Sequence, residues 1–202
     1  MKDVMKNALT GLGIYLIIVV LALVFLNALV MDGIAFRVIS FCVMVLVVAA
    51  VAFFEGGTKG EADSAHARLM EKRIATRGIE PTAAERQRYY KTWKGYAIAF
   101  IGAAPILLYA LFVFGASLAD QLQPWMTVSV RIALLPFISI FPDDVNMTWI
   151  YPVLALVYPV SLTVGYLMGP RRFAKLLRIM HENTEKRRKK QRAKRKKSVS
   201  AR

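Results

Sequence analysis

The chain has 202 residues, of which 56% are hydrophobic, and it carries a formal net charge of +15 at pH 7. Soluble domains mix apolar and charged residues, whereas this chain separates them into blocks, which is typical of membrane spans joined by polar segments. This composition excludes an ordinary soluble domain, and the single Cys42 excludes a disulfide framework.

Two apolar runs near the N-terminus predict the first two spans. Residues 12–31 are long enough to cross a hydrocarbon core of about 30 Å at about 1.5 Å per residue. No Ala-x-Ala cleavage site follows this run, so we expect a retained span and not a signal peptide. Residues 32–33 predict a turn, and residues 34–54 predict a second span that ends at the helix-breaking Gly56–Gly57 pair.

Residues 55–94 form a polar segment with its own helical pattern. A helix of mixed charge is expected over residues 61–77. Thr82 and Glu85 have the spacing of a capping box, which predicts the start of another helix. No helix-breaking residue follows for two dozen positions, so we expect this helix to continue without interruption into a third span over residues 96–119.

The apolar segment 125–141 is shorter than a typical span. It has 17 residues and is interrupted by Pro136, which favours a re-entrant or interfacial segment at the outer face. The alternative is a fifth span. The fourth span is expected over residues 149–169, with a kink at Pro159 because proline removes a helix hydrogen bond.

The C-terminal part is strongly basic. Over residues 171–180 the apolar side chains fall on one helical face beside Arg and Lys, which predicts a helix in the inner membrane interface. Ten of the twelve residues 186–197 are Lys or Arg, and we expect this tail to be disordered and solvated. The candidate residues for binding anionic lipid or RNA are Arg171, Arg172, Lys175, Arg178, Lys186, Arg187, Arg188, Lys189, Lys190, Arg192, Lys194, Arg195, Lys196 and Lys197.

The distribution of charge predicts the orientation. With four spans, 26 of the 28 Lys and Arg residues fall on one side, and basic segments stay cytoplasmic. A five-span chain would export the basic tail and lose this asymmetry. The expected fold is therefore an all-α integral membrane protein with both termini in the cytoplasm. Residues 1–170 form the membrane domain and residues 171–202 form the basic helix and tail.

The chain offers little chemistry for catalysis. The expected spans hold no Asp, Glu, Lys or His away from their edges, which argues against a self-contained secondary transporter. The sequence has no phosphate-binding loop and no HExxH pair, so no cofactor or metal is expected. Glu55 and His66 are the candidates that a membrane enzyme would have to use.

Small residues recur at every fourth position in two of the expected spans, which lets helix backbones approach closely. Both ladders lie in the inner halves of antiparallel spans, so we expect them to pack against each other; the alternative is that one faces a second copy of the chain. The two ladders are Gly95, Ala99 and Ala103, and Ser161, Gly165 and Gly169.

These observations predict a non-enzymatic multi-pass membrane protein, an accessory or scaffold component whose basic cytoplasmic face binds anionic lipid or RNA. One alternative is the membrane subunit of a larger transporter or secretion assembly, and a second is an interfacial membrane enzyme. The expected partners are the anionic inner leaflet, RNA or the ribosome through the tail, and a membrane-protein partner or a second copy.

Overall fold

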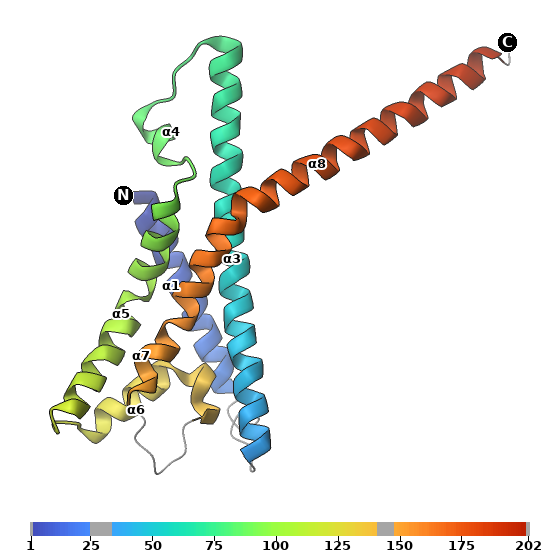
Figure 1. Cartoon of the computed structure of the whole chain (residues 1–202). Coiled ribbons are helices and arrows are strands. Elements are labelled where there is room, and N and C mark those ends of the chain that lie inside the picture. Colours follow the sequence, from blue (N-terminus) through green and yellow to red (C-terminus); the bar gives the residue numbers. More distant parts are fainter. Residues whose placement is uncertain (1, 25–33, 141–147, 201–202) are drawn as a thin grey trace.

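The computed structural model describes residues 2–24, 34–140 and 148–200, which form helices joined by turns (Figure 1). Within these residues, four helical stretches are long and apolar enough to cross a membrane, as the sequence predicts. They are α1 (Lys2–Val24), α3 (Ile34–Arg77), α5 (Thr92–Leu118) and the stretch formed by α7 (Ile150–Ala155) and α8 (Val157–Ser200).

The bundle has two distinct ends. The start of α1, the connection between α3 and α5, and the part of α8 beyond Pro170 lie at one end, which we call the loop end (Figure 1). The segment between α5 and α7 lies at the other, which we call the far end. Helices α3 and α8 run side by side in the same direction, and α1 packs on α5.

Helix α3 continues through the glycines at which we expected it to end. The expected break at Gly56–Gly57 is wrong, because α3 extends to Arg77 without interruption. A Cβ on Gly56 would lie 2.0 Å from the carbonyl oxygen of Leu162, and a Cβ on Gly60 would lie 2.4 Å from that of Tyr166. These glycines therefore let the backbone of α8 lie directly against α3.

The end of α3 and the start of α4 (Ala83–Gln87) follow local sequence rules. The chain leaves α3 at Gly78, which has φ +63°, and the Gly78 N–H donates to the Ile74 carbonyl at 2.8 Å. The expected capping box is present, since Glu85 N–H donates to Thr82 Oγ1 and Thr82 N–H donates to the Glu85 carboxylate. That backbone hydrogen bond from Thr82 lowers the pKa of the Glu85 carboxyl.

We expected one uninterrupted helix from Thr82 into the third span, but α4 and α5 are separate helices. Helix α4 ends at Gln87, and α5 begins at Thr92 after Lys91 adopts an extended conformation. In the connection, Tyr90 stacks on Tyr166 of α8 with ring centroids 5.2 Å apart, and Arg88 lies 3.5 Å from the Asp3 carboxylate of α1. These tertiary contacts interrupt a helix that local propensity alone would extend.

The described part of the segment 125–141 folds back under the far end. It forms α6 (Pro124–Ala133) and a 3₁₀ helix, η1 (Leu135–Ile140), and residues 141–147 lie outside the described residues. Ten helical residues extend about 15 Å, half of a hydrocarbon core, so α6 alone is too short to cross it. Leu134 and Phe137 are buried, and the Tyr15 hydroxyl of α1 donates to the Ala133 carbonyl at 2.9 Å.

Two prolines shape the fourth span. The helix is interrupted at Leu156, between α7 and α8, because Pro159 has no N–H to donate to the carbonyl of Ala155 one turn earlier. Further along, α8 contains Pro170, and Figure 1 shows α8 bending away from α3 before its red half. The basic half of α8 thus leaves the bundle at the loop end.

We expected the two ladders of small residues to pack against each other, but they face different neighbours. A Cβ on Gly165 would lie 2.1 Å from the Phe53 carbonyl oxygen, so this ladder faces α3. A Cβ on Gly95 would meet the Tyr166 ring of α8 at 2.6 Å. The two ladders do not meet because α3 occupies the side of α8 that carries Gly165 and Gly169. Of the other ladder residues, Ala99 and Ala103 are buried and Ser161 is half-buried.

Candidate functional site

A stripe of ionisable residues follows the loop half of α3. Glu55, Lys59 and Asp63 stand at positions i, i+4 and i+8, which places them on one face of the helix. Because α3 passes through Gly56 and Gly57 as a helix, this face is held against the neighbouring helices. Buried charges of this kind are stable only where they are paired and hydrogen-bonded.

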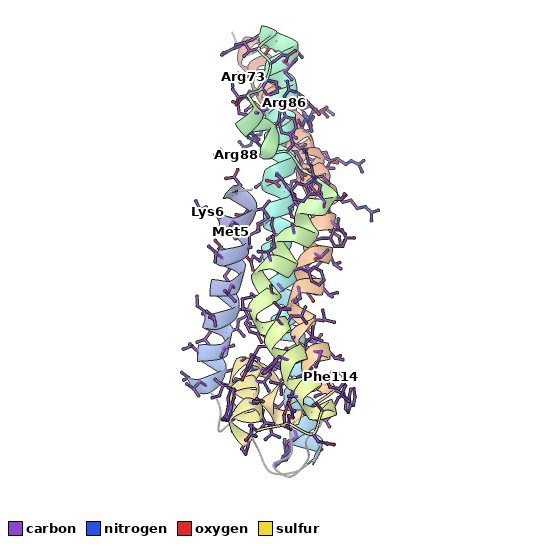
Figure 2. All side chains as sticks on the ribbon, turned by 90° about the vertical axis from the view of Figure 1, so that its left-hand side faces the viewer. Met5, Lys6, Arg73, Arg86, Arg88 and Phe114 are labelled. Carbon is purple, nitrogen blue, oxygen red and sulfur yellow. The ribbon has the colours of Figure 1, made fainter. Side chains whose placement is uncertain are left out.

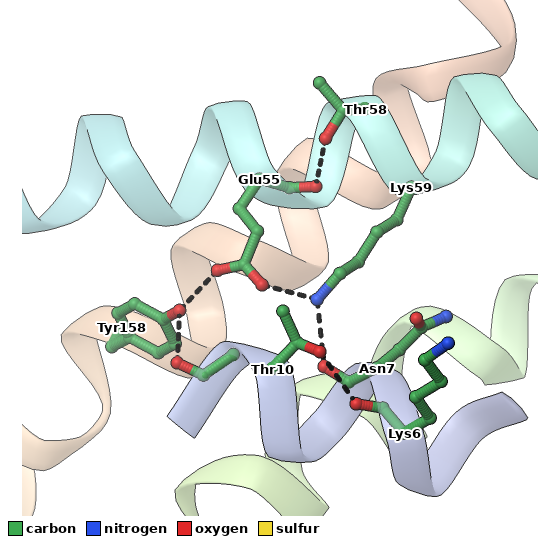
Figure 3. A network of polar contacts seen from close by, with 8 residues as sticks. Lys6, Asn7, Thr10, Glu55, Thr58, Lys59 and Tyr158 are labelled. Carbon is green, nitrogen blue, oxygen red and sulfur yellow. Dashed lines mark hydrogen bonds and ion pairs between the residues drawn. The ribbon is translucent and has the colours of Figure 1, made fainter. Parts of the chain in front are cut away.

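Glu55 is at the centre of a network that joins three helices (Figure 3). Its carboxylate accepts hydrogen bonds from the Lys59 ammonium and from the Tyr158 hydroxyl of α8. Lys59 Nζ also donates to the Asn7 carbonyl of α1 at 2.9 Å, and the Tyr158 hydroxyl lies 2.9 Å from the Gly11 carbonyl. The network therefore fixes α1 and α8 to α3.

Asp63 makes a second ion pair two turns further along α3. Its Oδ2 accepts from Lys94 Nζ at 3.0 Å and from the Tyr166 hydroxyl at 2.7 Å. The Lys94 side chain is only 5% exposed, so the cation of this pair is buried. It connects α3 to the start of α5 and to α8.

Arg172, a candidate lipid-binding residue, is engaged within the bundle. Its guanidinium pairs with the Glu61 carboxylate at 3.0 Å and lies 5.4 Å from the ring centroid of Phe54. Gly57 leaves room for it, because a Cβ there would lie 1.9 Å from Arg172 NH1. Arg172 therefore holds α8 on α3 at the place where α8 leaves the bundle.

The other basic candidates differ in how far the structure describes them. The side chains of Arg171, Lys175, Arg178 and residues 186–189 are exposed. Those of Lys190, Arg192, Lys194, Arg195, Lys196 and Lys197 lie outside the described side chains. The backbone is helical to Ser200 in place of the expected disordered tail, which agrees with the good helix propensity of Lys, Arg and Gln and with the lack of Gly or Pro after Pro170.

A cavity of about 320 Å³ opens at the loop end between α1, α3 and α5. Its polar lining comes from all three helices and from the connection before α5. The lining residues are Asp3, Val4, Lys6, Asn7, Ala62, Asp63, His66, Arg88, Lys94 and Ile98. We call this cavity the loop-end pocket.

The structure does not bring the two catalytic candidates together. Glu55 belongs to the network of Lys59 and Tyr158, whereas His66 lines the loop-end pocket and packs edge-on against Tyr89 with ring centroids 6.2 Å apart. They are eleven positions apart, which corresponds to about 16 Å along α3 at about 1.5 Å per residue. They are too far apart to act on one bond.

The sequence contained a signal for this stripe of ionisable residues, namely the i, i+4, i+8 spacing of Glu55, Lys59 and Asp63. We missed it because this spacing places the side chains on one face only within a continuous helix, and we expected the helix to break at Gly56–Gly57. The tyrosine partners had no such signal, since Tyr158 and Tyr166 follow Glu55 and Asp63 by 103 positions each.

In the described part of the chain, no group of three or more His, Cys, Asp or Glu side chains is placed to hold a metal ion. Both oxygens of the Glu55 carboxylate are already engaged by neighbouring side chains. The geometry thus combines a structural ion-pair network, an open polar pocket and an exposed basic helix. No protein-family model, curated protein or solved structure matches the chain.

Proposed function

We propose that the chain is a non-enzymatic integral membrane protein, an accessory or scaffold component whose helix α8 docks on the anionic surface of the inner leaflet. The observation that carries this proposal is that α8 leaves the bundle at the loop end with exposed cations along it (Figure 1). Both termini are then cytoplasmic, because basic segments are retained on that side.

The first part of α8 outside the bundle has two faces. Leu176 and Met180 are 48% and 64% exposed and lie one turn apart on the same side of the helix. Arg171, Lys175 and Arg178 are exposed and lie on the opposite side. A helix with this pattern lies in the interface with its apolar face among the acyl chains, an arrangement that suits a bilayer better than RNA.

The charges also set the strength of the contact. Each Lys or Arg near an anionic leaflet contributes about 1 kcal/mol, so a few of the ten basic residues in 186–197 are enough to hold the helix on the surface. The contact is electrostatic, and salt should weaken it because exposed charges are screened.

Reporter fusions test the orientation. A reporter placed in the connection after Arg77 and one placed after Arg202 should both report the cytoplasm, because a four-span arrangement puts 26 of the 28 basic residues on one side. A reporter inserted after Gln121, between α5 and α6, should report the outside. A C-terminal fusion that reports the outside while the Arg77 fusion reports the cytoplasm would show that the segment 125–141 crosses the membrane.

Fluorescence in nanodiscs tests the docking of α8. The full chain carries Cys42→Ala and an environment-sensitive label on Met180→Cys, with a label on Arg178→Cys as the matched control on the charged face. We expect a blue shift for position 180 in discs with phosphatidylglycerol and none for position 178. High salt, or replacement of the basic residues in 186–197 by Gln, should abolish the shift.

The same samples test two alternatives, a contact that does not depend on charge and binding of RNA in place of lipid. A shift that is equal in neutral discs and insensitive to salt contradicts an electrostatic contact with the leaflet. Release of the label from anionic discs by stoichiometric RNA would identify RNA as the preferred polyanion and would also contradict the proposal.

A further inference from the structure

The loop-end pocket has an excess of positive charge. Arg88 lies 3.5 Å from the Asp3 carboxylate and Lys94 lies 3.0 Å from that of Asp63, so each acid in the lining already has a cation. Lys6 is the third cation of the lining, and it has no acidic partner among the described residues. Figure 2 shows Arg88 beside the start of α1, the helix that carries Lys6. An anion fits this lining better than a cation.

Two buried polar atoms near the pocket lack hydrogen-bond partners within the described part of the chain. They are Nε2 of His66, which lines the pocket, and the hydroxyl of Tyr89, whose ring packs on His66. A buried polar atom without a partner costs free energy, so such atoms are usually paired with a bound molecule or water. Of the two, His66 belongs to the pocket lining, and its Nε2–H can donate to a phosphate oxygen.

The lining also has an apolar part. Val4 and Ile98 give the pocket an apolar side, which suits a ligand that has a hydrocarbon portion.

We propose that the loop-end pocket binds a phosphate group, carried either by a lipid headgroup of the inner leaflet or by a small soluble phosphate ester. Lys6 and Arg88 contact the phosphate oxygens, and His66 donates the third hydrogen bond. This site lies on the bundle and is separate from the surface contact of α8. A lipid as the source rests on the orientation proposed above, whereas phosphate recognition does not.

Native mass spectrometry of the delipidated full chain tests the site. We expect retention of phosphatidylglycerol over phosphatidylcholine, and a loss of at least about tenfold in Lys6→Gln/Arg88→Gln, because a hydrogen bond to a charged group changes affinity by about that factor. His66→Leu should also weaken retention. Lys6 and Arg88 are exposed, so their variant should keep the elution profile of the wild type.

Two controls distinguish lipid binding in the loop-end pocket from lipid binding by the basic tail. Arg86→Gln removes an exposed cation of α4 that pairs with Glu80 and does not line the pocket, and it should not change retention. Deletion of 186–202 should likewise leave retention unchanged, whereas it abolishes the α8 signal in nanodiscs. If the deletion removes lipid retention and the pocket variants do not, the pocket proposal is wrong and the tail alone binds.

Competition identifies the source of the phosphate. Millimolar inorganic phosphate or glycerol 3-phosphate that displaces the lipid from the wild type, and binds more weakly to Lys6→Gln/Arg88→Gln, shows that a phosphate group is recognised. Binding of these compounds without any lipid retention assigns a soluble ester. Equal retention of both lipids in the wild type and in every variant, together with no binding of soluble phosphate, overturns the proposal.

Discussion

Lys59→Met is expected to destabilise the bundle by about 3–5 kcal/mol, because removal of one partner from a buried ion pair leaves the other charge uncompensated. The side chains of Glu55 and Lys59 are only 8% and 14% exposed. Without Lys59, the Glu55 carboxylate keeps only the Tyr158 hydroxyl, and the link to the Asn7 carbonyl of α1 is lost. Reversible unfolding in mixed micelles with increasing SDS measures the free energy.

A double-mutant cycle separates the pair from the packing of its side chains. Glu55→Gln/Lys59→Met should recover most of the lost stability, since an uncharged pair needs no compensation in a buried site. Glu80→Gln is the matched control, because the Arg86–Glu80 pair is largely exposed and such pairs contribute about 0–1 kcal/mol. A neutral effect of Lys59→Met would contradict the buried network.

Alanine at Gly56 or Gly165 is expected to cost about 1–3 kcal/mol or more, because added atoms in a packed interface force shifts of the backbone. The new Cβ would lie 2.0 Å from the Leu162 carbonyl oxygen in the first case and 2.1 Å from the Phe53 carbonyl oxygen in the second. Neither carbonyl can rotate away as a side chain can, so α3 and α8 must separate. The same SDS titration measures the loss.

Two other glycines in the spans are matched controls. A Cβ on Gly13 of α1 or Gly115 of α5 meets nothing within 4 Å. Alanine at these positions should be neutral or stabilising by up to about 1 kcal/mol, because glycine is a poor helix former. If Gly56→Ala and Gly13→Ala behave alike, the close contact between α3 and α8 does not exist.

The features that the sequence predicted correctly depend on short stretches of chain. Four apolar helical stretches follow from hydropathy, which needs no knowledge of neighbouring helices. The capping box of Thr82 and Glu85 involves positions three residues apart. The interruption near Pro159 follows from the missing N–H of proline. In each case the physical cause lies within about one helical turn or within one span.

The features that it predicted incorrectly depend on contacts between distant segments. Gly56 and Gly57 have a low helix propensity, but α8 packs closely enough on this side of α3 to keep the helix continuous. The helix over residues 83–87 does not reach α5, because Tyr90 stacks on Tyr166. The stacking partner lies far along the chain, so no local pattern contains it.

The sequence by itself determined where the chain is apolar, that Thr82 and Glu85 form a capping box, and that the helix is interrupted near Pro159. Only the tertiary structure decided that α8 lies beside α3, that Glu55 and Asp63 are paired with Tyr158 and Tyr166, and that a polar pocket opens at the loop end. The physical reason is that helix propensity and hydropathy are properties of neighbouring residues, whereas burial of a charge is tolerated only with a partner that the fold supplies.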